Sequence, residues 1–252
     1  MISQSEIHSQ LNNIWQIFTT AGVTDPLTII ENLAYFFLQE EFQIGDFYGI
    51  SSRNLQLFES SQNTHSSFAP KDLLPGLIHK FPDLTGVPDI KQLVPQFTSS
   101  LGIDRYQQIS AAVHSFLQRV PSAAEVFNET LPEFLEKMGP GGRYFTPRHL
   151  TRWASSLLDI FPNSRLADFA CGSGGFLVEA AKKLTSVVGV EISPNWARLA
   201  FANCLLHGIQ KPDIRIGNSL SIFGKYEKNI QFDRVLMNPP FGAKVDDSLV
   251  ST

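Results

Sequence analysis

The 252 residues, 43% of them hydrophobic, predict a globular protein with one large core or two smaller ones, and the net charge of −4 excludes an overall basic field for binding nucleic acid. Two cysteines exclude a disulfide framework and suit no zinc site. The first residues predict no secretion signal and no stretch is long and apolar enough to cross a membrane, so we expect a cytoplasmic protein.

The N-terminal half predicts helices. Apolar residues recur at helical spacing over residues 7–18, 27–37 and 109–120, and Asp25-Pro26 forms a cap and first-turn pair before the second stretch. Residues 51–70 are polar and serine-rich and predict a loop, whereas Ser122 caps a further helix that Pro132 breaks. The glycine-rich stretch from residue 139 predicts a boundary, so we expect a helical domain over 1–138 and a second domain over 139–252.

A strand, a glycine loop and a helix follow one another in the second half. An apolar run at 165–170 leads into Cys171-Gly172-Ser173-Gly174-Gly175, and a helical pattern covers 176–184. This layout is typical of a nucleotide-type site, because glycines let the backbone approach a ligand and the loop amides favour a carboxylate or phosphate. The stretch lacks the third spaced glycine of G-x-G-x-x-G and the G-x-x-x-x-G-K-[ST] element, which argues against a nucleoside triphosphate. A glycine turn without a ligand is the alternative interpretation.

The next strand, predicted at 187–192, carries Glu191 about twenty residues after the glycine loop. That spacing lets the carboxylate reach the hydroxyl groups of a ribose. Ser193-Pro194 forms a cap and first-turn pair for a helix over 195–207. The alternative interpretation of Glu191 is a solvated carboxylate at a strand end.

Two further strands are predicted at 214–217 and 232–237, and the second is expected to be buried. It ends in Asn238-Pro239-Pro240-Phe241. The amide oxygen of Asn238 and the carbonyl of Pro239 can accept hydrogen bonds from a planar ring that carries an amino group, and Phe241 can stack on that ring. The alternative interpretation is an ordinary proline turn.

Taken together, these segments resemble the N6-adenine DNA methyltransferases. Residues 168–177 are similar to the D-P-A-C-G-S-G-G-F-L motif of that family, and residues 238–241 match its catalytic N-P-P-[FY] motif. Residues 143–149, which include Phe145-Thr146-Pro147, match the F-x-T-P-R segment of the modification subunits of type I restriction-modification systems. The N-terminal stretches resemble the helical N-terminal domain of those subunits.

The resemblance implies an α/β fold in which an N-terminal helical domain precedes a partial S-adenosylmethionine-dependent methyltransferase domain of Rossmann-like topology. The family sheet has the strand order 3-2-1-4-5-7-6, and four of its strands can be placed here, up to 232–237. The last strands are therefore expected to be lacking, which would leave 232–237 at an unpaired edge. A truncated gene, a fragment, or a split protein completed by another chain would each explain this.

The resemblance also implies the site residues. The catalytic turn would consist of Asn238, Pro239, Pro240 and Phe241. The cofactor S-adenosyl-L-methionine would be bound by Phe145, Thr146, Pro147, Asp168, Ala170, Cys171, Gly172, Ser173, Gly174, Glu191, Ile192, Asn218 and Ser219. Two positions depart from the family: Phe169 stands where proline is usual, and Asn218 stands where an aspartate would accept from the adenine of the cofactor. The second departure puts cofactor affinity in doubt more than cofactor identity.

The implied function is site-specific adenine-N6 methylation of DNA, with a specificity subunit, a restriction subunit and a complementing C-terminal chain as partners. Two alternatives stay open: an N-methyltransferase that acts on RNA or on a protein amide, and an inactive or split fragment that binds only cofactor or partner. Basic residues near the motifs either contact DNA or form a solvated surface; they are Arg143, Arg148, Arg152, Lys182, Lys183 and Lys244.

Overall fold

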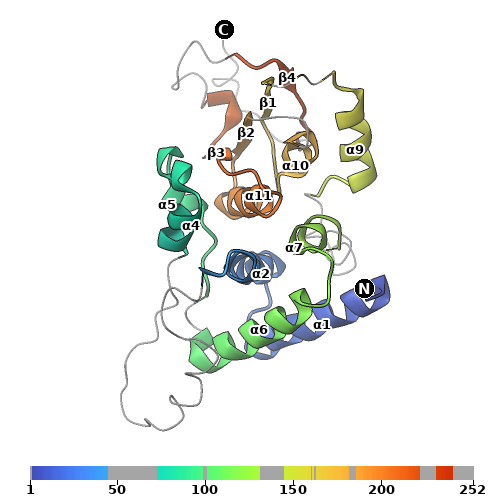
Figure 1. The fold of residues 1–252 in the computed structure, drawn as a ribbon, viewed down its shortest axis with the longest axis vertical. Helices are drawn as coiled ribbons and strands as arrows, with labels where there is room; N and C mark the ends of the chain where they lie inside the picture. Colours follow the sequence, from blue (N-terminus) through green and yellow to red (C-terminus); the bar gives the residue numbers. More distant parts are fainter. Residues whose placement is uncertain are drawn as a thin grey trace. The chain divides into compact units, whose positions relative to one another are not determined.

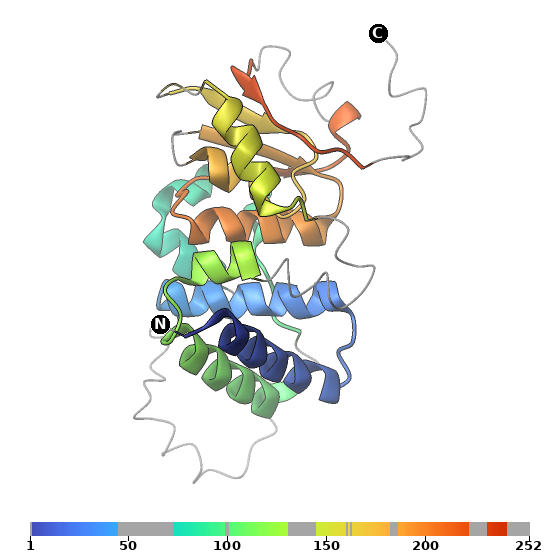
Figure 2. The same ribbon diagram turned by 90° about the vertical axis from the view of Figure 1, so that its right-hand side faces the viewer.

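The computed structural model describes residues 2–44, 73–98, 101–130, 145–159, 161, 163–181, 186–221 and 231–240. The chain forms two compact units, one of Met1–Pro82 with Pro95–Ala123 and the other of Asp83–Val94 with Ala124–Thr252 (Figure 1). The first is helical and the second contains the sheet (Figure 2). The sequence predicted a boundary at 138/139, whereas the units join Asp83–Val94 and the chain from Ala124 onward to the sheet.

Helix α1 (Gln4–Thr20) of the first unit begins with a capping box, in which the Ser3 hydroxyl accepts from the Glu6 N–H and the Glu6 carboxylate accepts from the Ser3 N–H. Its predicted apolar stripe is confirmed as buried: Ile7, Leu11, Ile14, Trp15 and Phe18. Helix α1 packs against α6 (Gly102–Leu117), which buries three of its predicted core residues, Ile109, Val113 and Phe116.

Helix α2 (Pro26–Glu41) begins as predicted, because the Asp25 carboxylate accepts from the Thr28 N–H at 2.8 Å. The apolar residues predicted at helical spacing are buried at Ile30, Leu33, Ala34 and Phe37, and burial extends to every residue from 29 to 38. Two of its side chains belong to an aromatic cluster. The rings of Tyr35 and Phe36 lie 5.2–6.3 Å, centroid to centroid, from those of Phe97 and Tyr106. Over residues 29–38, helix α2 is thus buried on all sides, as is typical of a core helix.

The first unit also contains α4 (Leu74–Lys80), and the second contains α5 (Ile90–Leu93) and the π-helical turn η4 (Val126–Thr130). The short elements η2 (Pro82–Gly86) and α7 (Ala123–Glu125) each include a boundary between the units. Within the described ranges, no helix is both long and apolar enough to span a bilayer.

The sheet of the second unit has four described strands in the order β3-β2-β1-β4, and all pairs are parallel. The strands are β1 (Arg165–Asp168), β2 (Ser186–Glu191), β3 (Asp213–Ile216) and β4 (Arg234–Val235). Helices α10 (Gly175–Ala181) and α11 (Pro194–Leu206) connect the first three (Figure 1). Both crossovers step in the same direction across the sheet, so right-handed connections place both helices on one face. The predicted α/β fold and strand order are confirmed for these elements.

The last strand differs from its prediction. Two residues of β4 pair with β1, and Leu236 N–H adds a hydrogen bond to the Ala167 carbonyl at 3.0 Å. Its side chains are not buried as expected, since Val235 is 45% and Met237 41% exposed. The physical reason is that β4 has a strand neighbour on one side alone among the described residues. Its predicted position at the sheet edge is confirmed for the same residues.

Helix α9 (Arg148–Leu157) has an inverted distribution of polarity. Its buried residues are polar, Thr151 and Ser155, whereas Leu150, Trp153 and Leu157 are exposed. Helix α9 packs against α10, so its polar side faces the glycine loop and the helix that follows it. A helix that presents polar groups to its neighbour can hold backbone groups there by hydrogen bonds.

Candidate functional site

The predicted site residues lie where the parallel strands end. Asp168 is the last residue of β1 and Glu191 the last of β2, while Asn218 and Asn238 follow β3 and β4 by two and three residues. The carboxyl ends of parallel strands meet at one edge of a sheet, and ligands of open α/β sheets bind outside that edge. The sequence therefore brings these four positions to a single edge.

The glycine loop forms a tight turn that packs closely against helix α11. The Gly174 N–H donates to the Cys171 carbonyl at 2.7 Å, and the Cys171 N–H donates to the Val190 carbonyl of β2 at 3.0 Å. Gly174 has a φ of +80°, and a Cβ placed there would lie 3.2–3.3 Å from backbone and side-chain atoms of Ala200. Both the dihedral angle and the close approach to α11 therefore require glycine at this position.

Glu191 holds two backbone N–H groups. Its Oε2 accepts from Gly172 N at 3.0 Å and its Oε1 accepts from Ser193 N at 2.9 Å. The carboxylate thus joins the glycine loop to the start of α11, and its remaining lone pairs can still accept from a ligand hydroxyl. Ser193 occupies the predicted cap position, but within the described part of the chain its side chain makes no capping hydrogen bond to α11.

Asp168 is buried beneath the loop, and its Oδ1 accepts from the Ala170 N–H at 3.1 Å. Burial raises the pKa of this carboxyl to about 7; the Ala170 hydrogen bond opposes the shift and the charge of Glu191 adds to it. Burial also raises the pKa of the Cys171 thiol well above its usual value. A thiol with a raised pKa is a poor nucleophile, so Cys171 fits a structural role as a small residue of the loop.

The raised pKa of Asp168 predicts a stability that falls as pH rises. Between the ordinary aspartate pKa of about 4 and about 7, the folded chain keeps a proton that the unfolded chain has lost. We expect the free energy of unfolding to drop by about 2 kcal/mol from pH 5 to pH 8 through this group, and Asp168→Asn to remove that drop. Urea unfolding of both proteins at the two pH values measures it. The same pH dependence in both would contradict the assignment.

The F-T-P segment and the N-P-P turn meet in space. Asn238 Nδ2 lies 3.4 Å from Thr146 Oγ1, to which it donates, although the two residues are 92 positions apart. Phe145 packs edge-on against Trp196 of α11, with ring centroids 5.1 Å apart, and Pro147 is the cap residue of α9. Pro239 and Pro240 are exposed, whereas Phe241 lies outside the described residues.

The other predicted cofactor residues are less closely gathered. Asn218 Oδ1, the predicted acceptor for an adenine, accepts from the Leu220 N–H at 3.0 Å within its own turn, and Ser219 beside it is half-buried. Ile192 is exposed just beyond Glu191, and Ala170 is half-buried before the loop.

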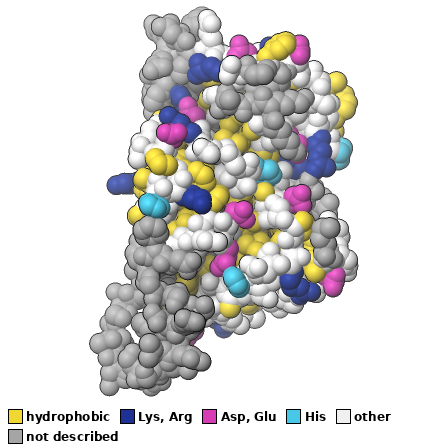
Figure 3. Space-filling model, viewed as in Figure 1, with side chains coloured by type: hydrophobic (Ala, Val, Ile, Leu, Met, Phe, Trp, Pro, Cys, Tyr) yellow, Lys and Arg dark blue, Asp and Glu magenta, His cyan; other side chains and the backbone are white. Residues whose placement is uncertain are grey.

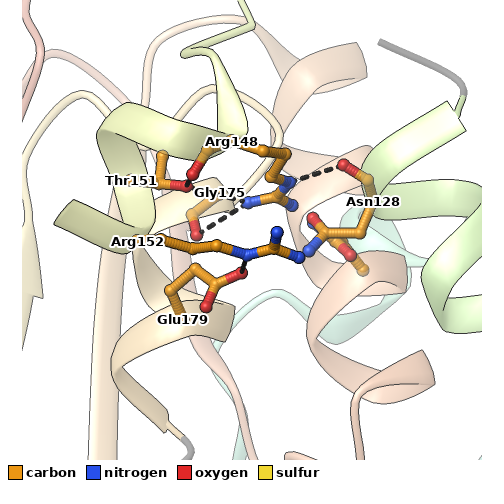
Figure 4. Close-up of polar contacts among 7 residues, drawn as sticks. Asn128, Arg148, Thr151, Arg152, Gly175 and Glu179 are labelled. Atoms are coloured by element: carbon orange, nitrogen blue, oxygen red, sulfur yellow. Dashed lines mark hydrogen bonds and ion pairs between the residues drawn. The ribbon is translucent and has the colours of Figure 1, made fainter. Parts of the chain in front are cut away.

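Two of the predicted basic residues are engaged with the protein itself (Figure 4). Arg148 is half-buried and donates to the backbone carbonyls of Asn128 and Gly175, and Arg152 pairs with the buried Glu179 at 3.5 Å. A solvated surface is therefore the wrong interpretation for Arg148. The remaining basic residues of that prediction, Arg143, Lys182, Lys183 and Lys244, lie outside the described residues.

Sequence reasoning missed Asn128, Asn203 and Glu179. Asn203 is buried in α11 and donates to the Ser173 carbonyl at 2.9 Å and to Asn128 Oδ1 at 3.1 Å. The available signal was a polar stripe on α9, because Arg148, Thr151 and Ser155 recur at helical spacing and require polar partners if that face is buried.

Comparison with known proteins gives a family match. The N-6 DNA Methylase family (N6_Mtase) matches residues 123–252. The methylase subunit of the type I restriction enzyme StySPI from Salmonella potsdam is 34% identical over 142 residues, covering 46% of this chain and 26% of that protein. The MjaIX methylase subunit from Methanocaldococcus jannaschii is 31% identical over 183 residues, covering 66% and 31%.

Solved structures share the fold. A modification subunit assigned to a type I restriction enzyme from Vibrio vulnificus YJ016 gives a TM-score of 0.61 at 19% identity, covering 99% of this chain and 63% of that one. The type I restriction-modification methyltransferase subunit from Streptococcus thermophilus gives 0.57 at 18% identity, covering 97% and 65%. The matched regions thus span 26–31% of the two curated relatives and 63–65% of the two solved chains.

Proposed function

This chain belongs to the N-6 DNA methylase family, and we propose that it acts as the modification subunit of a type I restriction-modification system, methylating N6 of a flipped adenine in DNA. The observation that carries the proposal is the 3.4 Å contact between Asn238 and Thr146. It joins the F-T-P segment to the N-P-P turn at the edge of a parallel sheet where ligands bind. A planar base and a methyl donor could both be held at that edge.

The residues at this edge fit S-adenosyl-L-methionine. Glu191 offers carboxylate lone pairs to ribose hydroxyls, and its hydrogen bond to the Gly172 N–H keeps the glycine loop beside them. Asp168, Phe145 and Asn218 complete the proposed set, together with the other residues predicted from the sequence. When bound, S-adenosyl-L-methionine would supply a methyl group activated on a sulfonium, because the thioether that remains after transfer is a good leaving group.

The proposed role of the N-P-P turn is to accept hydrogen bonds from the amino group of the adenine. Asn238 Nδ2 donates to Thr146, and the proposed acceptors are the Oδ1 of the same amide and the Pro239 carbonyl. Two such acceptors favour a pyramidal nitrogen, whose lone pair is then available for the methyl group. No strong general base is needed, because positioning and fixed dipoles carry the rate. Phe241 is proposed to stack on the flipped base, and such stacking contributes roughly 1–3 kcal/mol to holding the base outside the duplex.

Partners are proposed to supply most of the DNA affinity. On the face drawn in Figure 3, acidic and basic side chains are interspersed over the described surface, and the net charge is −4. Arg148 and Arg152 are occupied by protein groups. A specificity subunit that reads the target, a restriction subunit, and a complementing C-terminal chain are the proposed partners, in keeping with the relatives' names as subunits.

A transfer assay with labelled cofactor tests this function. We expect label at N6 of adenine in duplex DNA when a specificity subunit is present, and little or none with the chain alone. Transfer to RNA or to a protein amide would favour that alternative. Cofactor binding without transfer to DNA, with partners present, would favour a fragment that binds cofactor or partner only.

Glu191→Gln should weaken binding of S-adenosyl-L-methionine about tenfold. Each carboxylate oxygen accepts a backbone N–H, so the amide would oppose one of these donors with its own N–H group. Calorimetry measures the affinity. Asp213→Asn is the matched control, because this carboxylate pairs with Arg215 at the opposite end of the sheet. Equal affinities in the two variants would remove Glu191 from the cofactor site.

A further inference from the structure

We propose that Arg148 is a positioning residue for the glycine loop, and that it works with Asn128 and Asn203 to hold the loop in the shape that receives the cofactor. The inference rests on the proposed function and deepens it. It assigns a task to the arginine of the F-T-P-R segment that its neighbours Thr146 and Pro147 do not share.

The guanidinium of Arg148 ties three segments of the chain together (Figure 4). Nε donates to the Asn128 carbonyl of η4, and Nη1 donates to the Gly175 carbonyl at 3.2 Å and to Thr151 Oγ1 at 3.3 Å. A Cβ placed on Gly175 would lie 3.3 Å from Nη1, so glycine at this position leaves room for the guanidinium. The planar fork of arginine suits this task, because its donors point in fixed and different directions.

Asn203 holds the neighbouring part of the loop. Its Nδ2 donates to the Ser173 carbonyl at 2.9 Å and to Asn128 Oδ1 at 3.1 Å, and the side chain is buried. Asn128 therefore meets Arg148 through its backbone and Asn203 through its side chain. The half-buried Arg148 and the buried Asn128 and Asn203 thus form one network around the carbonyls of the loop.

A hydrogen bond to each of these carbonyls also fixes the direction of the N–H group in the same peptide. The C=O and N–H of a trans peptide point in opposite directions. Holding the Ser173 carbonyl therefore aims the Gly174 N–H, which closes the turn onto Cys171 at 2.7 Å, and holding the Gly175 carbonyl turns the Phe176 N–H away from Arg148. The shape of the loop is thus set by one donor from α9, Arg148, and one from α11, Asn203.

Arg152 provides the matched control. It lies one turn further along α9 and also contacts α10, but its Nε pairs with Glu179 in the body of that helix and not with the loop. Arg152→Met removes the Glu179 ion pair between the same two helices and leaves Arg148 at the Gly175 carbonyl.

The test compares the wild-type 252-residue chain with Arg148→Met, Arg148→Lys and Arg152→Met. Hydrogen exchange of the loop amides is measured without cofactor, and affinity for S-adenosyl-L-methionine is measured by calorimetry. We expect Arg148→Met to speed loop exchange and to weaken cofactor binding about tenfold, with partial recovery in Arg148→Lys and neither effect in Arg152→Met.

Loop exchange and affinity in Arg148→Met that match those of Arg152→Met would overturn the inference. If Arg148→Met does not fold, the comparison of Arg148→Lys with Arg152→Met decides in the same way. A wild-type chain that does not bind the cofactor would contradict the proposed function, while the exchange rates would still decide whether Arg148 positions the loop.

Discussion

Asn238→Ala is expected to lower methyl transfer by about a hundredfold to a thousandfold, while S-adenosyl-L-methionine affinity changes by less than about twofold. The variant removes an acceptor that is used mainly as the adenine nitrogen becomes pyramidal, so the loss falls on the transition state. Asn238 is exposed, and its side chain donates one long hydrogen bond of 3.4 Å to Thr146, so folding should be unaffected. Single-turnover transfer, measured with a specificity subunit present, and calorimetry separate the two effects.

Asn238→Asp is the informative companion variant. It keeps an acceptor oxygen but loses the N–H that donates to Thr146, so we expect an activity between those of the wild type and Asn238→Ala. Thr146→Val removes the same contact from the other side and should resemble Asn238→Asp. Unchanged transfer in Asn238→Ala would refute the proposed mechanism.

Gly174→Ala is expected to destabilise the chain by about 3 kcal/mol and to abolish cofactor binding at ordinary concentrations. The added Cβ combines a positive φ with contacts of 3.2–3.3 Å to Ala200, which is buried in the middle of α11. Two of those contacts are to backbone atoms, which cannot turn aside as a flexible side chain would. Urea unfolding and calorimetry measure the two consequences.

Gly208→Ala separates the dihedral angle from the contact. Gly208 follows α11 with the same φ of +80°, but a Cβ there meets no heavy atom within 4 Å. We expect this control to cost about 1 kcal/mol, which is the cost of the left-handed conformation alone. Equal losses in the two variants would mean that the loop can move away from α11.

The features that the sequence predicted well are those with local causes. The stretch before the glycine loop, the loop itself and the helix after Ser193-Pro194 follow from apolar runs and backbone preferences that neighbouring residues set. The order of the four strands came from the family resemblance and is confirmed among the described elements. The hydrogen bond between Asn238 and Thr146 was not predicted, because it joins residues that are 92 positions apart in the sequence.

The features that escaped prediction depend on distant partners. The burial expected for residues 232–237 required a second neighbour beside β4, and periodicity gives no information on whether a neighbour exists. The polar stripe of α9 was not predicted to be buried; it faces α10, where Arg148 donates to the carbonyl of Gly175 and Arg152 pairs with the carboxylate of Glu179. Glu191 was predicted to bind a ribose. Its hydrogen bonds to the Gly172 and Ser193 N–H groups could not be predicted, because they depend on how the loop packs beside α11.

The contact between Phe145 and Trp196 gives the protein a built-in optical probe. Trp196 is buried at the site, Trp15 is buried in the helical unit, and Trp153 on α9 is exposed. A water-soluble quencher would therefore reach Trp153 first and leave the emission of the other two indoles. With Trp15 and Trp153 replaced by phenylalanine, the remaining fluorescence would report movement of the F-T-P segment against α11, without a label and without a substrate.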